Sequence, residues 1–418
     1  MMILSTEQIY DTISKSIETH TDDLASICKK RQIHENPEFN FEEFQAHDNI
    51  CDLLQNLDFK VTRHAYGLET SFEAEFGQGG KLVVFNAEYD ALPGLGHACG
   101  HNLIATSSIA AFLATAEVLR HGKFKGRVRL LGTPAEEGGG GKIRLLEAGA
   151  YQGVDACLMA HPTGRLSPEG AQKVDGISGA KSSARRQLEV TFKGQNAHAG
   201  MSPWHGKNAL DAVVSSYVNI SLLRQQLPPS ARVHGVIRAG GSEPNIIPDT
   251  TSLEYYLRES TVEKIQDLSR KVEACFKAGA VGTGCTLKCD WHSDKDYMEL
   301  CPNTAISTEF TRHMKAFGRE YLEDSGKPPM GASTDMGNVT YLVPGIHPMF
   351  SIGTEDPLIQ PHTPEFAAAA GTKEALDSAL DCGKGLAATA CELLLGPELS
   401  NKAWEEFRRD VEPIIGRL

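Results

Sequence analysis

Short apolar segments alternate with longer helical patterns through much of this 418-residue chain, and this alternation constrains the fold more than any other feature. The segments with the pattern of a buried strand, each stopping at polar or Gly/Pro residues, are 81–90, 127–137, 156–162 and 347–353. Between the first two, the segment after Asn102 has the apolar pattern of a helix, with Asn102 as its N-cap and a glycine at its exit. Strands that alternate with helices indicate an α/β fold, so we predict an open mixed sheet with helices on both faces.

A second pattern occupies residues 187–293. Strand, helix, strand, strand, helix and strand signals follow one another there, which is the order of a ferredoxin-like α+β unit. We therefore predict two domains. The larger one is formed by 1–186 and 294–418, and the smaller one, 187–293, is inserted into it.

Charge and cysteine usage exclude several classes of function. The formal net charge is −13 and no basic run carries interleaved aromatic residues, so we expect no nucleic acid as partner. Nowhere do 18 apolar residues run together, and the start of the chain lacks a charged segment followed by an apolar one, so we expect no membrane partner. The ten cysteines are scattered, which is typical of reduced, mostly buried thiols, and we expect a cytoplasmic location.

Several polar side chains lie at or just beyond the carboxyl ends of the predicted strands: Asp90, Cys99, His101, Glu136, Glu137 and His161. Open α/β sheets bind ligands at this edge. Thiolate, imidazole and carboxylate groups bind zinc and similar divalent ions, and a pair of ions needs both bridging and terminal ligands. On an extended backbone the adjacent Glu136 and Glu137 would point to opposite sides, one toward metal and one toward the bound water. This set of residues predicts metal-assisted hydrolysis.

Six motifs occur in order over most of the chain: EYDALPGLGHACGHNL, TPAEEGGGGK, MAHP, GQNAHAG, NIIPD and HTPEF. Together they resemble the co-catalytic metallopeptidase family of aminoacylases, bacterial carboxypeptidases and indoleacetyl-amino-acid hydrolases (metallopeptidase family twenty). LGHACGHNL and STDMGNVTYLVPGIHPMF resemble one branch in particular, the beta-alanyl-lysine (Xaa-Arg) dipeptidases and the B subunit of aminobenzoyl-glutamate hydrolase. The resemblance implies a hydrolase of amide bonds that depends on metal ions.

The resemblance also assigns roles position by position. The metal ligands that it implies are Cys99, His101, Glu137, His161 and His362. Glu136 corresponds to the general base, and Asp90 to the acidic residue that supports and orients the metal site. The implied cofactors are two divalent metal ions per chain, zinc or manganese.

Three positions of the insert match residues that reach the substrate in relatives. His198 corresponds to a group near the developing oxyanion, and Asn245 and Arg258 to groups at the carboxylate end of the substrate. Because every implied ligand lies in the flanking segments, we expect 187–293 to act as a lid whose closure completes the site, and it is also a possible surface for a homodimer. His347 is a further candidate, which could compete as a ligand or contact the substrate.

Two positions depart from the family pattern. Glu88 stands two residues before Asp90 where the amidohydrolases have Asp, and Asn102 follows the Cys-Gly-His motif where they also have Asp. Both departures concern groups that support the metal ligands, so they bear on the identity and the affinity of the metal.

We therefore predict a metal-dependent hydrolase that cleaves the amide bond of a dipeptide or N-acyl amino acid by metal-activated water. An aminoacylase or an aminobenzoyl-glutamate-type amidohydrolase is an alternative to a dipeptidase, since the motifs fit all three substrates. Two other classes remain: a cysteine nucleophile at Cys99, against which the surplus of carboxylates argues, and a non-catalytic regulatory subunit that retains the fold.

Overall fold

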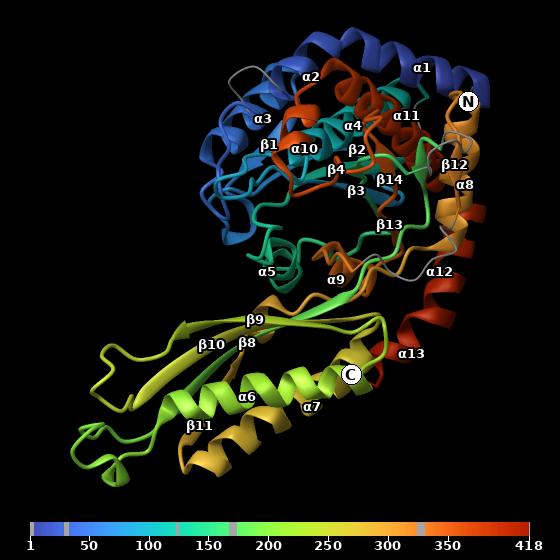
Figure 1. The fold of residues 1–418 in the computed structure, drawn as a ribbon. Helices are drawn as coiled ribbons and strands as arrows, with labels where there is room; N and C mark the ends of the chain where they lie inside the picture. The colour runs from blue at the N-terminus through green and yellow to red at the C-terminus, as the bar shows by residue number, and fades with distance from the viewer. Residues whose placement is uncertain (1–3, 29–32, 123–124, 167–173, 324–330, 418) are drawn as a thin grey trace. The chain divides into compact units, whose positions relative to one another are not determined.

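The computed structural model describes residues 4–28, 33–122, 125–166, 174–323 and 331–417, which form two compact units (Figure 1). The large unit lies within Met1–Lys181, Leu300–Lys327 and Asn338–Leu418, and the small unit within Ser182–Glu299 and Pro328–Gly337. The small unit thus includes 331–337, a segment far from the insert in sequence. The Ser183 amide donates a hydrogen bond to the Ala332 carbonyl at 2.8 Å, which ties this segment to the start of the insert.

The main sheet of the large unit has the strand order β1-β2-β4-β3-β5-β13 in the described residues. Its strands are β1 (Lys60–Arg63), β2 (Phe72–Gln78), β3 (Leu82–Ala87), β4 (Gly126–Gly132), β5 (Ala156–Leu158) and β13 (Gly345–Ile346). β3 runs parallel to both β4 and β5, and β13 is parallel to β5, whereas β2 is antiparallel to β1 and β4. The predicted open mixed sheet is confirmed.

One predicted strand is divided between two sheets. A second sheet has the order β12-β7-β14-β6, with strands β6 (His161–Thr163), β7 (Gly176–Ile177), β12 (Tyr321–Leu322) and β14 (Met349–Ser351). The segment 156–162, expected as one strand, leaves the main sheet after β5 and enters the second sheet as β6. The predicted strand 347–353 contains β14, which pairs in parallel with β6, Met349 opposite His161, while β13 just before it belongs to the main sheet.

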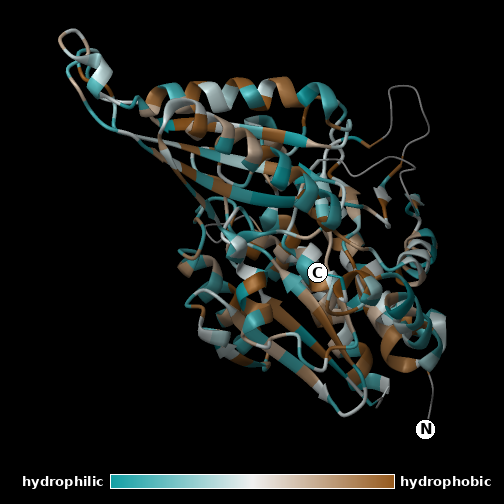
Figure 2. Ribbon diagram, turned by 90° about the horizontal axis from the view of Figure 1, so that it is seen from below, coloured by the Kyte–Doolittle hydropathy of each residue, from teal (hydrophilic) through white to brown (hydrophobic). Residues whose placement is uncertain are grey.

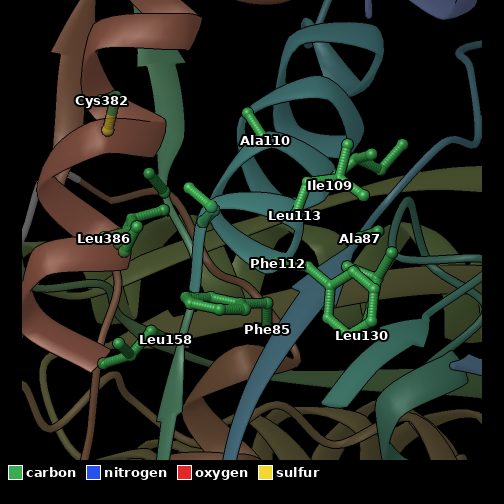
Figure 3. Packing of buried hydrophobic residues seen from close by; sticks show 14 of the residues in the cluster. Phe85, Ala87, Ile109, Ala110, Phe112, Leu113, Leu130, Leu158, Cys382 and Leu386 are labelled. Atoms are coloured by element: carbon green, nitrogen blue, oxygen red, sulfur yellow. The ribbon is translucent and has the colours of Figure 1, made fainter. Parts of the chain in front are cut away.

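The core of the large unit forms around helix α4 (His101–Gly122) and helix α11 (Lys373–Leu395). Figure 3 shows Phe85 and Ala87 of β3, Leu130 of β4 and Leu158 of β5 beside Ile109, Ala110, Phe112 and Leu113 of α4 and Cys382 and Leu386 of α11. The two helices approach closely, because a Cβ at Gly383 would lie 3.0 Å from that of Ala110. α4 is apolar and long enough to cross a membrane, but 94% of its most apolar window is buried in the protein, as expected of a core helix.

The predicted N-cap of this helix is wrong. α4 begins at His101, so Asn102 lies inside the first turn, where its amide donates a hydrogen bond to the Ala370 carbonyl at 2.9 Å. The other helices outside the insert are α1 (Thr6–Thr19), α2 (Thr21–Cys28), α3 (Phe44–Asn56), α5 (Gly141–Glu147), α8 (Thr304–Ala316), α9 (Met336–Thr340), α10 (Pro364–Ala370), α12 (Pro397–Asp410) and α13 (Glu412–Ile415).

The small unit has the predicted ferredoxin-like order. Its elements are β8 (Ala184–Lys193), α6 (Ala209–Leu223), β9 (Arg232–Ala239), β10 (Thr250–Glu259), α7 (Val262–Thr283) and β11 (Thr286–Trp291). The antiparallel sheet has the order β11-β8-β10-β9, so the first and third strands of the unit lie in its centre. Hydrophobic and hydrophilic stretches alternate along the helices and strands (Figure 2), and the hydrophobic side chains build a separate core.

Candidate metal centre

The loops after the parallel strands bring the candidate residues of the large unit together. Asp90 follows β3, and Glu136 and Glu137 follow β4, so both segments leave the same edge of the sheet. Cys99 and His101 stand at the start of α4. His161 opens β6, and His362 comes two residues before α10. Chain segments far apart in sequence thus supply donor atoms to one site.

The turn of the Cys-Gly-His motif needs its glycine. Gly100 has φ +79°, and a Cβ on it would lie 2.6 Å from Cγ of Pro162. The backbone of Gly100 thus packs against the Pro162 side chain, and the neighbouring Cys99 Sγ lies 3.4 Å from Nε2 of His161. His161 donates from Nδ1 to the Pro162 carbonyl at 2.6 Å, which leaves the Nε2 lone pair directed toward the sulfur.

Asp90 orients His101 and the turn after β4. Its Oδ1 accepts from Nδ1 of His101 at 3.1 Å, and its Oδ2 accepts from the Glu137 amide at 2.9 Å. All three groups are buried or nearly so. Burial lowers the pKa of His101, but the charges of Asp90 and Cys99 outweigh it and raise that pKa well above its usual value. A histidine whose Nδ1 is held by a carboxylate presents Nε2 to a metal in a fixed direction.

The two adjacent glutamates lie in a turn, so the expectation of opposite sides on an extended strand is wrong. Ala135 before them has φ +58°, and the Gly139 amide donates to the Ala135 carbonyl at 3.1 Å. As a result Glu136 and Glu137 each offer a carboxylate oxygen within 4.8 Å of the other and of a His101 nitrogen. Both carboxylates therefore face the same centre.

His362 reaches this centre from the far end of the chain. Its amide donates to the Ala98 carbonyl at 2.8 Å, and its backbone has a positive φ of 69°. Nε2 of His362 lies 3.3 Å from Oε1 of Glu137. Burial raises the pKa of Glu137, but the nearby imidazole of His362 and the charge of His101 lower it to about 2. Positive φ values at two non-glycine residues of one site indicate backbone strain held by its surroundings.

Unpaired buried atoms show that the site fits metal ions. Nε2 of His101, Oε1 of Glu137 and Oε2 of Glu88 are buried and have no hydrogen-bond partner. Burying such atoms without a partner costs free energy, and a cation between them would supply the missing interaction. Two sets of possible metal ligands share Cys99. One consists of Cys99, His101 and His161, and the other of Cys99, Glu137 and His362. Their sulfur, nitrogen and oxygen atoms suit zinc or manganese.

The same surroundings disfavour Cys99 as a nucleophile. Burial and the charge of Glu137 raise the pKa of its thiol well above the usual value, and Glu136 acts in the same direction. Reactive thiolates sit in electropositive surroundings. A thiol beside two carboxylates needs a cation to ionise, as a metal ligand does.

The other candidates of the large unit lie beside this centre or support it. His347 is 4% exposed, its Nε2 has no hydrogen-bond partner, and its ring centroid is 5.6 Å from that of His161. Glu43, just before α3, accepts from the Ala135 amide at 2.9 Å and so holds the turn that carries the two glutamates. Burial and the charge of Asp90 raise the pKa of Glu43 to about 7. Only the structure reveals this role, because Glu43 and Ala135 are remote in sequence.

The lid candidates belong to the small unit. His198 and Asn245 are exposed, and the Ala199 amide donates to the Asn245 carbonyl at 2.9 Å, so their two loops lie side by side. Nδ1 of His198 accepts from the Met201 amide at 3.1 Å. Arg258 on β10 donates to the Gly331 carbonyl at 2.8 Å and to Oγ of Ser333 at 3.1 Å, within the same unit. His198 and Asn245 thus come together, while Arg258 contacts a different loop.

At this edge of the sheet, buried nitrogen and oxygen atoms without hydrogen-bond partners lie next to a turn that carries two adjacent glutamates. This arrangement is that of a metal-dependent hydrolase of amide bonds. Residues 84–381 match the model of Peptidase family M20/M25/M40, and the chain belongs to this family. The predicted membership and class are confirmed.

Similar proteins agree with this assignment. Xaa-Arg dipeptidase of Mus musculus is 40% identical over 392 residues, which cover 90% of this chain and 88% of that protein. The B subunit of p-aminobenzoyl-glutamate hydrolase from Escherichia coli (strain K12) is 31% identical over 330 residues, or 75% of this chain and 66% of that protein. A Bacillus subtilis protein described as a dinuclear metal binding peptidase from the M20 family has the same fold, with a TM-score of 0.62, 21% identity and coverage of 92% of this chain and 99% of that one.

Proposed function

We propose that this protein is a dipeptidase that uses two divalent metal ions, zinc or manganese, to cleave dipeptides with a basic C-terminal residue. The observation that carries the proposal is the cluster of buried, unpaired donor atoms of His101 and Glu137 beside Glu136. The similarity to an Xaa-Arg dipeptidase over most of both chains supports the choice of substrate. The net charge of −13 also favours cationic substrates, as a basic C-terminal residue would provide.

Different side chains of the centre would have different roles in the reaction. The residues that would hold the ions are Cys99, His101, Glu137, His161 and His362. When bound, two divalent ions polarise a carbonyl group and acidify a water molecule. Glu136 takes the proton of that water and delivers it to the leaving amine. Asp90 fixes the orientation of the His101 ring through Nδ1, and Nε2 would then be the atom that holds an ion.

The small unit is proposed as a lid. His198 would donate a hydrogen bond to the oxyanion of the tetrahedral intermediate, and Asn245 and Arg258 would bind the carboxylate end of the substrate. His347 would contact the substrate beside His161. The exposed loop that carries His198 suits a group that engages the substrate only on closure.

A substrate comparison tests the proposed specificity. The protein is stripped with a chelator, reloaded with manganese or zinc, and assayed on dipeptides that end in Arg, Lys, Ala or Glu. N-acetyl amino acids and aminobenzoyl-glutamate are assayed beside them. We expect no activity without metal and kcat/KM values for Arg and Lys dipeptides about tenfold or more above the Ala dipeptide, the effect of one missing charged contact. A preference for aminobenzoyl-glutamate or for acetyl substrates would select the alternative amidohydrolase function.

We also propose a homodimer through the small unit. β9 is an edge strand with Val236 and Ile237 about half exposed, and α6 exposes Tyr217 and Leu222. An edge strand with apolar side chains is a surface that proteins normally cover. Sedimentation of the full chain measures the mass, and a monomer at micromolar concentration would contradict this assembly. The ten free cysteines are consistent with the cytoplasmic location that we propose, which cell fractionation would test.

A further inference from the structure

Glu88 is a buried carboxylate that has no role in the chemistry above. It follows the last residue of β3 and is 0% exposed. Its two oxygens have different surroundings. Oε1 accepts a hydrogen bond from the ammonium group of Lys142, whereas Oε2 has no hydrogen-bond partner and lies 3.5 Å from Nε2 of His101.

The free oxygen of Glu88 faces the metal donors. Nε2 of His101 also has no hydrogen-bond partner, and it lies 3.9 Å from the unpaired Oε1 of Glu137. Nδ1 of His101 already contacts Asp90, so Nε2 is the ring nitrogen that remains for a metal ion. Two buried carboxylate oxygens beside the same ring nitrogen repel each other unless positive charge, such as that of a metal ion, lies between them.

Lys142 fixes the orientation of this carboxylate. The lysine is 0% exposed and comes from the glycine-rich segment that opens α5. A Cβ at Gly141 would lie 1.7 Å from the Pro134 carbonyl oxygen, so only glycine permits the backbone path that places Lys142 beside Glu88. With one oxygen held by the ammonium group, the other must turn to the centre. An oxygen of Glu88 also lies within 4.8 Å of one of Glu136.

We propose that Glu88 is a further metal-facing group of this centre, whose carboxylate oxygen enlarges the donor set and favours manganese over zinc. The inference rests on the proposed function, because it requires the neighbouring residues to hold divalent ions. Zinc is satisfied by four nitrogen, sulfur or oxygen ligands, whereas carboxylate oxygens suit manganese. Glu88 adds such an oxygen, and the positive charge of Lys142 balances the added negative charge inside the protein.

Metal titration of Glu88→Gln tests this inference. The glutamine keeps the shape of the side chain and can still accept from Lys142, but it loses the charge that faces the ions. Full-length parent and variant proteins are stripped with a chelator and titrated separately with Mn²⁺ and Zn²⁺ in a calorimeter. We expect the Kd for Mn²⁺ to rise about 10- to 100-fold, the usual loss when a group that supports a metal site is removed. The Kd for Zn²⁺ should rise much less.

Two further variants keep the test decisive. Glu88→Asp retains the charge beside Lys142 but withdraws the oxygen, so it should also lose preference for Mn²⁺ even if the glutamine variant does not fold. Asp155→Asn is the control, because Asp155 accepts from the Leu82 amide at 2.8 Å, at the opposite end of β3. An unchanged Mn²⁺ affinity in the folded Glu88 variants, or an equal loss for both ions, would overturn the inference. A parent protein that binds neither ion would instead reject the proposed function.

Discussion

Replacement of Glu136 by Gln should lower kcat on the order of 10²- to 10⁴-fold, the usual contribution of general acid–base catalysis. Glu136 is 7% exposed and its carboxylate lies within 4.8 Å of a His101 nitrogen and a Glu137 oxygen, so it belongs to the proposed metal centre. Glutamine has the same size but accepts no proton. Metal content and thermal stability should therefore stay close to those of the parent while turnover falls.

The control for this variant is Glu147→Gln. Glu147 is the last residue of α5 and is exposed, so its replacement by glutamine should leave kcat unchanged. Steady-state kinetics on an Arg dipeptide, with metal analysis of each sample, measure both effects. Near-normal turnover of Glu136→Gln would remove Glu136 as the base, and loss of metal from this variant would make it a ligand instead.

Replacement of His198 by Ala should lower kcat roughly 10²- to 10³-fold, which is the cost of losing one donor to an oxyanion. The contact is made mainly in the transition state, so KM should move little. His198 lies in an exposed loop and is remote in sequence from every proposed metal ligand, so metal content and thermal stability should remain as in the parent.

His205→Ala is the matched control for this prediction. His205 is also an exposed histidine of the small unit, at the end of the short 3-10 helix Pro203–His205, and its Nε2 accepts from the Trp204 indole at 3.2 Å. If both variants turn over a good substrate as fast as the parent does, His198 is an ordinary loop residue. That result would contradict its proposed role in stabilising the oxyanion. If only His198→Ala is slow, the lid assignment stands.

The sequence predicted which polar residues gather at one edge of the sheet because of where strands end. Apolar runs such as 81–90 mark buried strands, and polar residues directly after them must gather at one edge of a parallel sheet. The order of the insert was equally visible, since each of its strands and helices has its own periodicity. His362 could not be placed in this way, because it precedes a short helix rather than following a strand, and only the resemblance pointed to it.

Other features depend on contacts between remote segments. The turn at Ala135 needs a positive φ, which no sequence pattern at an alanine reveals, and it is supported by Glu43 from 92 positions earlier. Asn102 has the residue type of an N-cap, but the glycine turn before it lets the helix begin at His101. The direction of the free oxygen of Glu88 follows from Lys142, whose place is set by the close backbone approach at Gly141.

The central claim is that this edge of the sheet holds a pair of divalent ions, and metal analysis of the full-length protein tests it most directly. After reloading with manganese or zinc and removal of excess metal, the parent should contain two ions per chain. His101→Ala and Glu137→Ala should each contain fewer, because each variant loses a donor atom that is buried without a hydrogen-bond partner. A parent protein with full dipeptidase activity and no bound metal would contradict the account.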